Sequence, residues 1–371
     1  MENYINYLTN ITFQKKIILW GAGIFGINLA HLVKQNGGNI EYFVDMDETK
    51  WGTNCMGKVI KNPYDILYEN MDETIVLITA VSYITDITHT LRGMGLVENI
   101  HFFIATEHRN EEYDYVDYFL GYSRERKFYV HGDENSDIKI VALGGSTTDY
   151  SQYGIRSWPH YLSEIIEKKK GIVPCIYNGG VAGYLSNQEM LKCIRDVFDL
   201  KPLMVISYSG INDAFEGKKE NVLVNDYLDK TWQMLCQDKN IEITAGKCDE
   251  KEAVDRWIFN IKTMHGVCNE FHVPFYSFLQ PMMVSGQYIL SDDDLVYLEQ
   301  EIVQQRVRKT KAFYNVAAEK IGEISFIYNF SGIFDGMDNI YFDYCHCNEK
   351  GNKVIAGEIY RCLESELDKV L

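Results

Sequence analysis

A serine follows two glycines directly after an apolar run, in the segment Leu143-Gly144-Gly145-Ser146. On its own this pattern is typical of a turn. It also fits a sharp strand-to-helix turn that lifts the Ser146 hydroxyl out of a sheet and directs the serine's own N–H toward a bound group. Ser146 is therefore the candidate nucleophile.

A candidate base for this serine lies near the C-terminal end of the chain. Asp343 precedes His346 in the segment Asp343-Tyr344-Cys345-His346, just before the last predicted helix. A carboxylate at this spacing can reach back to Nδ1 of the imidazole, which fixes the tautomer and leaves Nε2 to take the serine proton. The plain alternative is a surface loop with an incidental carboxylate–imidazole pair.

Two further loops follow predicted strands and offer hydrogen-bond donors. One contains Gly179, Gly180 and Gly183, and the other contains Asn212. Glycine and asparagine in such loops are usually turn residues. In open α/β sheets, however, ligands bind at the carboxyl ends of the strands. The N–H groups of Ser146 and Gly183 and the Asn212 amide are therefore candidates for an oxyanion hole.

Taken in order, these segments resemble the SGNH (GDSL-like) hydrolase superfamily from about residue 138 to the C-terminus. Ser146 matches the serine of the family's first block, and Gly183 the glycine of the second, where Gly-Tyr-Leu-Ser resembles the family's Gly-x-x-Ser. Asn212 matches the asparagine of Gly-x-Asn-Asp, and Asp343 and His346 match Asp-x-x-His. The first block departs from the family's usual Gly-Asp-Ser by reading Gly-Gly-Ser. The replaced aspartate is not the triad acid, so the expected chemistry is retained.

The resemblance implies a serine-dependent O-acyl esterase, with acetyl as the expected acyl group, that works through an acyl-serine and requires no cofactor for catalysis. If a sugar hydroxyl outcompetes water, the same site is an O-acetyltransferase, and the sequence leaves both outcomes open. The contrasting alternative is a nucleotide-sugar-binding protein whose second domain is catalytically silent. A metal at Cys345-His346-Cys347 is not expected, because neighbouring side chains point in different directions and no Cys-x-x-Cys partner exists.

A second glycine-rich loop lies near the N-terminus. Gly21, Gly23 and Gly26 have the dinucleotide-binding spacing between a predicted strand and a helix, and Asp45 ends the next strand. The pattern predicts a nucleotide or nucleotide-sugar whose pyrophosphate meets the helix N-terminus and whose ribose meets Asp45. The alternative is that these glycines serve close helix–strand packing. No residue suited to hydride transfer was identified.

The region from Phe43 to Ile60 resembles a Rossmann-like module found at the N-termini of bacterial surface-polysaccharide enzymes, including sugar O-acyltransferases. This resemblance implies that the module binds a nucleotide or nucleotide-sugar, or only packs. Together with the hydrolase resemblance, it implies a carbohydrate or nucleotide-sugar substrate.

Apolar runs alternate with helical patterns along the whole chain, which favours parallel sheets covered by helices. The expected fold is α/β with two three-layer domains, Rossmann-like at the N-terminus and SGNH (flavodoxin-like) at the C-terminus. The expected boundaries are 1–108, a connecting helix and linker at 109–137, and 138–371. Lys218–Lys247 fits the pattern poorly and is treated as an insertion. That segment and a long predicted helix over Asp292–Ile321 are candidates for covering the active site or for a dimer contact. The predicted strands span 16–20, 40–44, 74–79, 100–104, 138–143, 175–178, 203–208, 275–279 and 324–328.

Composition narrows the choice of partners. The chain has 371 residues, 46% of them hydrophobic and 24% charged, as in ordinary globular proteins. A net charge of −17 argues against nucleic acids and anionic membrane surfaces as partners. The sequence shows no secretory signal and no apolar run long enough to cross a bilayer, and its nine scattered cysteines suit reduced thiols. We expect a cytoplasmic protein that acts on a small-molecule or glycan ester and can form a homo-oligomer.

Overall fold

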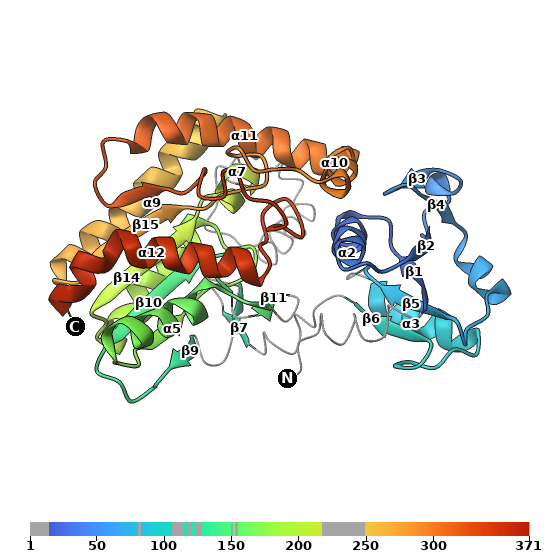
Figure 1. Ribbon diagram of the computed structural model, residues 1–371, viewed down its shortest axis with the longest axis horizontal. Helices are drawn as coiled ribbons and strands as arrows, with labels where there is room; N and C mark the ends of the chain where they lie inside the picture. Colours follow the sequence, from blue (N-terminus) through green and yellow to red (C-terminus); the bar gives the residue numbers. More distant parts are fainter. Residues whose placement is uncertain are drawn as a thin grey trace, which may run out of the picture.

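The computed structural model describes residues 15–80, 83–105, 115–117, 121–123, 128–149, 151–152, 155–216 and 249–370. These residues build two six-stranded sheets, each covered by helices (Figure 1). The predicted α/β class with two mostly parallel sheets is confirmed. The predicted insertion at Lys218–Lys247 lies outside the described residues.

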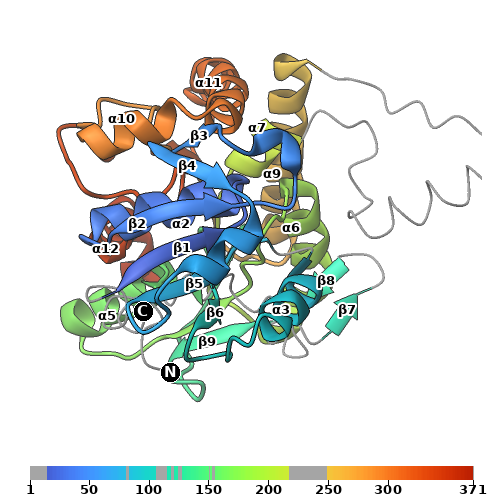
Figure 2. The same cartoon turned by 90° about the vertical axis from the view of Figure 1, so that its right-hand side faces the viewer.

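The N-terminal sheet has the strand order β3-β4-β2-β1-β5-β6, which Figure 2 shows from its exposed side. Counted along the chain, its five mutually parallel strands give the order 3-2-1-4-5, which is the Rossmann arrangement. The short strand β3 pairs antiparallel to β4. The elements of this N-terminal module are β1 (Lys16–Trp20), α2 (Ile24–Gln35), β2 (Ile40–Val44), β3 (Asn54–Cys55), β4 (Lys58–Lys61), β5 (Thr74–Ile78), α3 (Ile84–Gly93) and β6 (Phe102–Ile104).

The central strands are apolar along their whole length. In β1, Ile17 to Trp20 are all buried, and every residue of β5 is buried. A parallel strand that is covered on both faces carries a continuous apolar run instead of alternating polar and apolar residues. This is why both strands are visible in the sequence as short apolar runs.

The C-terminal sheet has the order β16-β15-β14-β10-β13-β9. Its five parallel strands, counted along the chain, give the order 2-1-3-4-5 of flavodoxin-like sheets. The edge strand β9 runs antiparallel to β13. The strands are β9 (Tyr129–Gly132), β10 (Lys139–Gly144), β13 (Cys175–Asn178), β14 (Met204–Ser209), β15 (Phe275–Leu279) and β16 (Ile327–Asn329).

The connection between the two sheets differs from its prediction. Instead of a connecting helix within 109–137, the described residues form β7 (Tyr115–Asp117) and β8 (Gly121–Ser123), which pair antiparallel, and then β9. At the described residues 115–117 and 121–123, strands therefore take the place of the predicted helix. Tyrosine and valine recur through this stretch, and such residues favour strands over helices.

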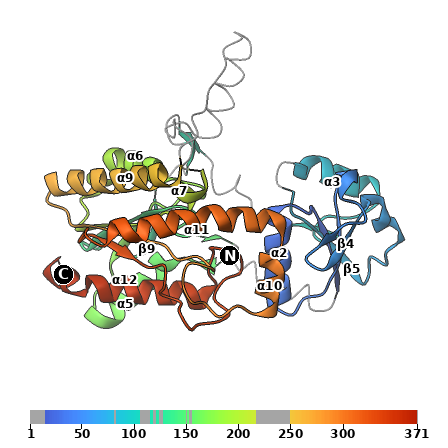
Figure 3. The same cartoon turned by 90° about the horizontal axis from the view of Figure 1, so that it is seen from above.

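Helices cover both faces of the C-terminal sheet. Figure 3 shows α5 and α12 on one side and α6, α7, α9 and α11 on the other, and helices on the same side contact each other. A small two-stranded sheet joins β11 (Ser151–Gln152) to β12 (Ile155–Arg156). The helices are α5 (Trp158–Lys170), α6 (Ser186–Lys192), α7 (Ile211–Glu216), α9 (Glu250–Glu270), α10 (Asp292–Leu298), α11 (Glu301–Ile321) and α12 (Glu349–Val370).

The long helix predicted over Asp292–Ile321 is broken into α10 and α11. The break lies at Gln300, whose backbone is extended with φ −66° and ψ 128°. The Gln300 side chain donates to the Val296 carbonyl and accepts a hydrogen bond from the Met56 N–H of the N-terminal module. The break therefore occurs where the C-terminal helices meet that module.

The apolar core is continuous from one sheet to the other. One buried cluster includes Ile17 and Ile27 of the N-terminal module together with Ile140 and Tyr297 of the C-terminal part. Helix α2 contacts α10 and lies between the two sheets (Figures 1 and 3). Among the described helices, none is both long enough and apolar enough to cross a membrane.

Candidate active site

The turn after β10 presents Ser146 at the carboxyl edge of the C-terminal sheet. The carbonyl of Gly145 accepts hydrogen bonds from the N–H groups of Thr148 and Asp149, at 3.1 and 3.0 Å, so the chain turns sharply here. A Cβ at Gly144 would overlap Thr148, and one at Gly145 would lie 2.6 Å from Nδ2 of Asn212. The two glycines before Ser146 are therefore required by lack of space.

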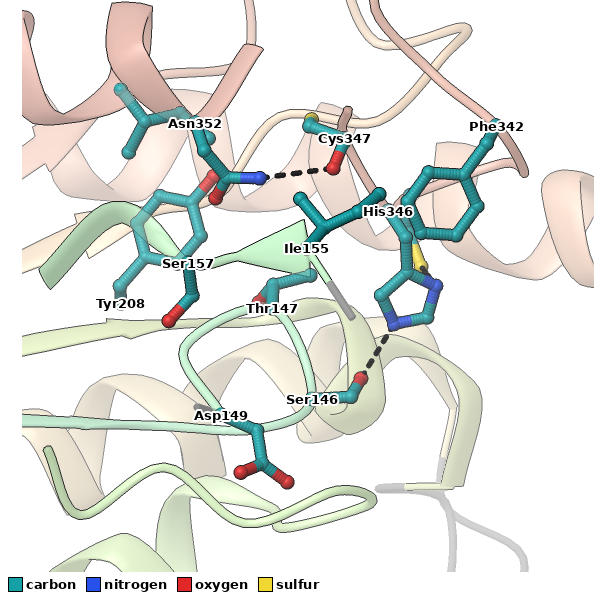
Figure 4. A pocket seen from close by; sticks show the side chains of 12 residues that line it. Ser146, Thr147, Asp149, Ile155, Ser157, Tyr208, Phe342, His346, Cys347 and Asn352 are labelled. Atoms are coloured by element: carbon teal, nitrogen blue, oxygen red, sulfur yellow. Dashed lines mark hydrogen bonds between the residues drawn. The ribbon is translucent and has the colours of Figure 1, made fainter. Parts of the chain in front are cut away.

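Ser146, His346 and Asp343 form a continuous hydrogen-bonded chain. His346 Nε2 lies 2.8 Å from Ser146 Oγ, and Figure 4 shows the hydroxyl directed at the ring. His346 Nδ1 lies 2.6 Å from Asp343 Oδ2. Because Nδ1 faces a carboxylate it carries the ring proton, and Nε2 is left to accept the serine proton.

The Asp343 carboxylate is fully buried and well supplied with donors. Its Oδ1 accepts the backbone N–H groups of Cys345 and His346, at 2.9 and 2.7 Å. Burial alone would raise the pKa of Asp343, but the attraction of His346 and these hydrogen bonds outweigh it, so the pKa lies below its ordinary value. The carboxylate therefore stays ionised and keeps the imidazole oriented.

The glycine-rich loop after β13 and the loop after β14 meet next to Ser146. Asn212 Nδ2 donates to the Tyr184 carbonyl at 2.9 Å and lies against Gly145. Gly183 has a φ of +82° with open space where a Cβ would be, whereas Gly179 and Gly180 are closely surrounded by other atoms. In the described part of the chain, the N–H groups of Ser146 and Gly183 have no hydrogen-bond acceptor. Both N–H groups therefore remain candidates for the predicted oxyanion hole.

Asp213 ties these two loops together. Its carboxylate accepts the N–H of Ser186 at 3.2 Å and the Ser186 hydroxyl at 2.5 Å, and Asn260 donates to that hydroxyl at 2.9 Å. Burial of Asp213 raises its pKa to about 6, although the Ser186 hydrogen bonds act to lower it. The network fixes the start of α6 against the start of α7.

A small cavity lies beside the nucleophile. Its volume is about 20 Å³, close to the room that one water molecule needs. Ser146 and His346 line it together with Tyr208, Asn352 and Ile355. Figure 4 shows Ser146, His346, Tyr208 and Asn352 from nearby. The space next to Ser146 Oγ therefore suits a small group.

The three-atom cluster of Asp343 Oδ2, Cys345 Sγ and His346 Nδ1 falls within 4.8 Å, a spacing also seen in metal sites. Burial raises the pKa of the Cys345 thiol well above its ordinary value, so the thiolate that a metal requires is disfavoured. His346 Nδ1 is already bonded to Asp343. The donor set therefore fits a triad better than a metal centre.

The glycine loop of the N-terminal module has distinct roles for its three glycines. Gly21 has a φ of +117°, a Cβ at Gly26 would overlap the Gly21 carbonyl, and Gly23 faces open space. These are the turn, packing and approach roles of a dinucleotide-binding loop. Asp45 accepts the Ala22 N–H and the Lys50 ammonium, both at 2.9 Å. A ribose at Asp45 would have to compete with these two donors.

One contact to the triad had not been predicted from the sequence. Asn28 of α2 donates from Nδ2 to Asp343 Oδ2 at 3.1 Å, although the two residues are 315 positions apart. The only trace in the sequence is that Asn28 and His31 are polar positions within the apolar run Ile24–Val33. Such positions in a buried helix indicate a polar partner, but not which one.

Two family models match the chain, one for each of its two sheets. The family model described as GDSL-like Lipase/Acylhydrolase matches residues 140–359. A second model, described as C2185-like, N-terminal, matches residues 13–102. No curated protein matches the chain.

Solved structures with a similar fold include three hydrolases. An acetylxylan esterase from Geobacillus stearothermophilus is 11% identical with a TM-score of 0.38, and the match covers 62% of this chain and 94% of that one. A lipolytic protein of the G-D-S-L family from Desulfitobacterium hafniense is 16% identical with a TM-score of 0.38, and the match covers 61% and 100%. An α/β hydrolase from the metagenome of Lake Arreo, Spain, is 18% identical with a TM-score of 0.37, and the match covers 61% and 95%.

Proposed function

The chain belongs to the GDSL-like lipase/acylhydrolase family, and from this premise we propose that it is a serine esterase that removes an O-acetyl group from a carbohydrate or nucleotide-sugar. The observation that carries the proposal is the placement of His346 between Ser146 and Asp343, at 2.8 and 2.6 Å. Nucleophile, base and orienting acid are thus in direct hydrogen-bond contact.

In the first step Ser146 Oγ attacks the ester carbonyl carbon while His346 Nε2 takes the hydroxyl proton. The N–H groups of Ser146 and Gly183 and the amide of Asn212 stabilise the resulting oxyanion. The carbon–oxygen bond to the sugar then breaks, and the leaving oxygen receives the proton from His346. Water, deprotonated by the same imidazole, attacks the acyl-serine and releases the acid.

Two observations support the choice of substrate. The cavity of about 20 Å³ beside Ser146 has room for a methyl-sized group, so it can receive the methyl group of an acetyl ester. The N-terminal module resembles those of surface-polysaccharide enzymes, which favours a sugar as the alcohol part of the ester.

The test is hydrolysis of p-nitrophenyl acetate, p-nitrophenyl octanoate and a panel of acetylated sugars by the wild type and by Ser146→Ala. We expect the acetate to react at least tenfold faster than the octanoate, and the variant to lose the activity. Equal rates for the wild type and the Ser146→Ala variant would refute the serine mechanism. A preference for octanoate would refute the assignment of acetyl.

The same acyl-serine can also pass its acetyl group to a sugar hydroxyl. Hydrolysis of an acetyl donor with and without an added unacetylated sugar separates the two reactions. A transferase yields acetylated sugar at the expense of free acetate, whereas an esterase yields only acetate.

We also propose that the glycine loop of the N-terminal module binds a nucleotide or nucleotide-sugar. Gly23 supports this, because open space surrounds it at the start of α2. A thermal-shift screen with NAD, UDP-sugars and acetyl-CoA tests it, with Gly23→Val as the variant that fills the space. No shift with any of these compounds would leave packing as the role of the loop.

A further inference from the structure

Helix α2 is enclosed on all sides. Its buried residues run without interruption from Gly26 to Val33. A helix turns once every 3.6 residues, so a buried run of this length leaves no face open to solvent. One side of α2 packs on its own sheet, and the other packs on α10 and on the segment that precedes His346 (Figure 3).

Three side chains on one face of α2 donate to three consecutive residues of that segment. Asn28 Nδ2 donates to the Asp343 carboxylate at 3.1 Å. His31 Nδ1 lies 2.7 Å from the Phe342 carbonyl, and Gln35 Nε2 donates to the Tyr341 carbonyl at 2.7 Å. Positions 28, 31 and 35 follow helical spacing, so they form one stripe along the helix. We call Asn28, His31 and Gln35 the donor stripe.

The hydrogen-bond network fixes the orientation of the Asn28 amide. Its Oδ1 accepts the Tyr297 hydroxyl at 2.9 Å, and that hydroxyl in turn accepts the Tyr344 N–H at 3.1 Å. A flipped amide would place Oδ1 against the Asp343 carboxylate, so that two acceptors would face each other. Asn28 therefore presents an N–H to Asp343.

This N–H reaches the same carboxylate oxygen that orients the catalytic imidazole. Asp343 Oδ2 accepts both His346 Nδ1 and Asn28 Nδ2, while Oδ1 accepts the two backbone N–H groups. With a donor on each side of Oδ2, the carboxylate cannot rotate without losing a buried hydrogen bond. The orientation of His346 toward Ser146 thus depends on a residue of the N-terminal module.

His31 anchors the same helix through a second buried contact. Its Nε2 lies 2.9 Å from Asp294 Oδ1, and its Nδ1 faces a carbonyl oxygen. Hydrogen bonds from His31 and Ser291 outweigh burial and keep the pKa of Asp294 below its ordinary value, so this carboxylate is ionised. Both ring nitrogens therefore face hydrogen-bond acceptors, which fixes the position of His31 between Phe342 and Asp294.

We infer that the N-terminal module completes the esterase site, with Asn28 as a positioning residue that acts through Asp343. The inference rests on the proposed serine mechanism and adds a fourth member to the hydrogen-bonded chain. Asn28 does not touch the substrate. It positions the Asp343 carboxylate, which in turn orients His346.

The test replaces the donor by an acceptor of the same size. In Asn28→Asp the new carboxylate faces Asp343, and we expect kcat for p-nitrophenyl acetate at pH 8 to fall about 100-fold, less than the ~10⁴-fold loss typical of removing the triad acid. KM should change less than twofold. Acidification protonates the new carboxyl and restores a donor, so the ratio of variant to wild-type kcat should rise as the pH is lowered.

The matched control is Asn36→Asp. Asn36 is exposed at the C-cap of α2, and its side-chain amide donates to the Leu32 carbonyl, its one partner among the residues that the structure describes. We expect wild-type kcat and an unchanged pH profile from this variant. A wild-type kcat and pH profile in folded Asn28→Asp would overturn the inference.

Two further measurements keep the test decisive. If Asn28→Asp does not fold, the second variant is Asn28→Ser, which keeps a shorter hydroxyl donor. It should still lower kcat at least fivefold. An unchanged kcat in this variant would overturn the inference. The proton NMR signal of the His346 Nδ1–H does not depend on esterase activity, and it should shift in the Asn28 variants but not in Asn36→Asp. If the wild type fails to hydrolyse esters, the proposed function fails, while this signal still decides whether Asn28 positions Asp343.

Discussion

The reactivity of Ser146 depends on where the protons of three side chains lie. Asp343 has a lowered pKa in the folded protein. Its ionised form therefore adds stability at any pH above the ordinary carboxyl value of about 4, and this contribution is lost only as the pH falls through the lower value of the folded state. Activity lost on mild acidification must come from another group of the site.

Replacing Asp343 by asparagine tests its role in orienting His346. The amide oxygen of Asp343→Asn can still accept the backbone N–H groups, but its NH₂ group facing Nδ1 favours the wrong tautomer of His346. We expect kcat for p-nitrophenyl acetate to fall about 10⁴-fold. The melting temperature should fall as well, because the stabilising carboxylate is lost and the new NH₂ group faces the Asn28 donor. A loss smaller than tenfold, measured by steady-state kinetics, would be inconsistent with the triad.

Site residues that lie in a recognisable local sequence pattern could be predicted from the sequence. Site residues without such a pattern could not. Ser146 follows two glycines and Asp343 precedes His346 by three positions, so both segments can be read from the chain. Asn28 reaches Asp343 only because two distant parts of the chain pack together. No spacing along the sequence encodes that contact.

A buried acid, Asp213, holds together the loops after β13 and β14 that contain the proposed oxyanion donors. Asp213 has its pKa raised to about 6 by burial. For an acid whose pKa is higher in the folded state, stability is greatest below the unfolded pKa, near 4, and declines as the pH rises through the folded value. The protein should therefore lose some stability between about pH 4 and pH 6 because of this one group.

The variant Asp213→Asn removes that titration. We expect the free energy of unfolding, from urea denaturation between pH 4.5 and pH 7.5, to vary less with pH than in the wild type. Replacing an exposed acid, as in Glu319→Gln, serves as the control and should keep the wild-type slope. An identical slope in Asp213→Asn would show that Asp213 is not the responsible group.

The loop before α2 gives a second prediction for the elements. A Cβ at Gly26 would overlap the Gly21 carbonyl, whereas Gly23 has open space. We expect Gly26→Ala to lower the free energy of unfolding by about 1–3 kcal/mol, as overpacking typically does. Gly23→Ala should cost less than about 1 kcal/mol, the scale of a helix N-cap change. Equal losses in chemical denaturation would argue against this packing role for Gly26.

Elements with long buried runs were predicted well, and short or irregular ones were not. Strands such as β1 and β5 carry continuous apolar runs because both of their faces are covered. The two-residue strand β3 has too few side chains to show a period. The break between α10 and α11 lies at Gln300, whose side chain accepts a hydrogen bond from Met56 in another part of the chain.

At the scale of the whole molecule, a buried contact between His31 and Asp294 joins the N-terminal module to the C-terminal part. The two residues are both almost fully buried, and their side chains lie 2.9 Å apart. Removing the His31 ring leaves the ionised Asp294 carboxylate without this buried donor, which typically costs about 3–5 kcal/mol. The interface is therefore sensitive to either residue.

A double-mutant cycle tests this pairing. We expect Asp294→Ala and His31→Leu each to destabilise the protein by about 3 kcal/mol, and the double variant to lose much less than the sum. The exposed pair of Lys353 and Glu349 provides the comparison, with no measurable coupling expected. Additive losses for His31 and Asp294 in urea denaturation would show that the two residues do not form a pair.

The arrangement of the two sheets is the feature that the sequence revealed least. Alternating strands and helices predicted each sheet, and the strand orders agree with the Rossmann and flavodoxin arrangements. Nothing in the pattern predicted that α2 would be buried between them. That placement is what connects the N-terminal module to Asp343.

The proposed esterase mechanism requires that Ser146 carries the acyl group during turnover. The direct measurement is mass spectrometry of the protein quenched shortly after mixing with excess p-nitrophenyl acetate, followed by peptide mapping. The acyl-serine mechanism predicts a mass increase of one acetyl group on the peptide that contains Ser146 in the wild type. It predicts no increase on the same peptide of Ser146→Ala. Acetylation at another residue, with Ser146 unmodified during turnover, would contradict it.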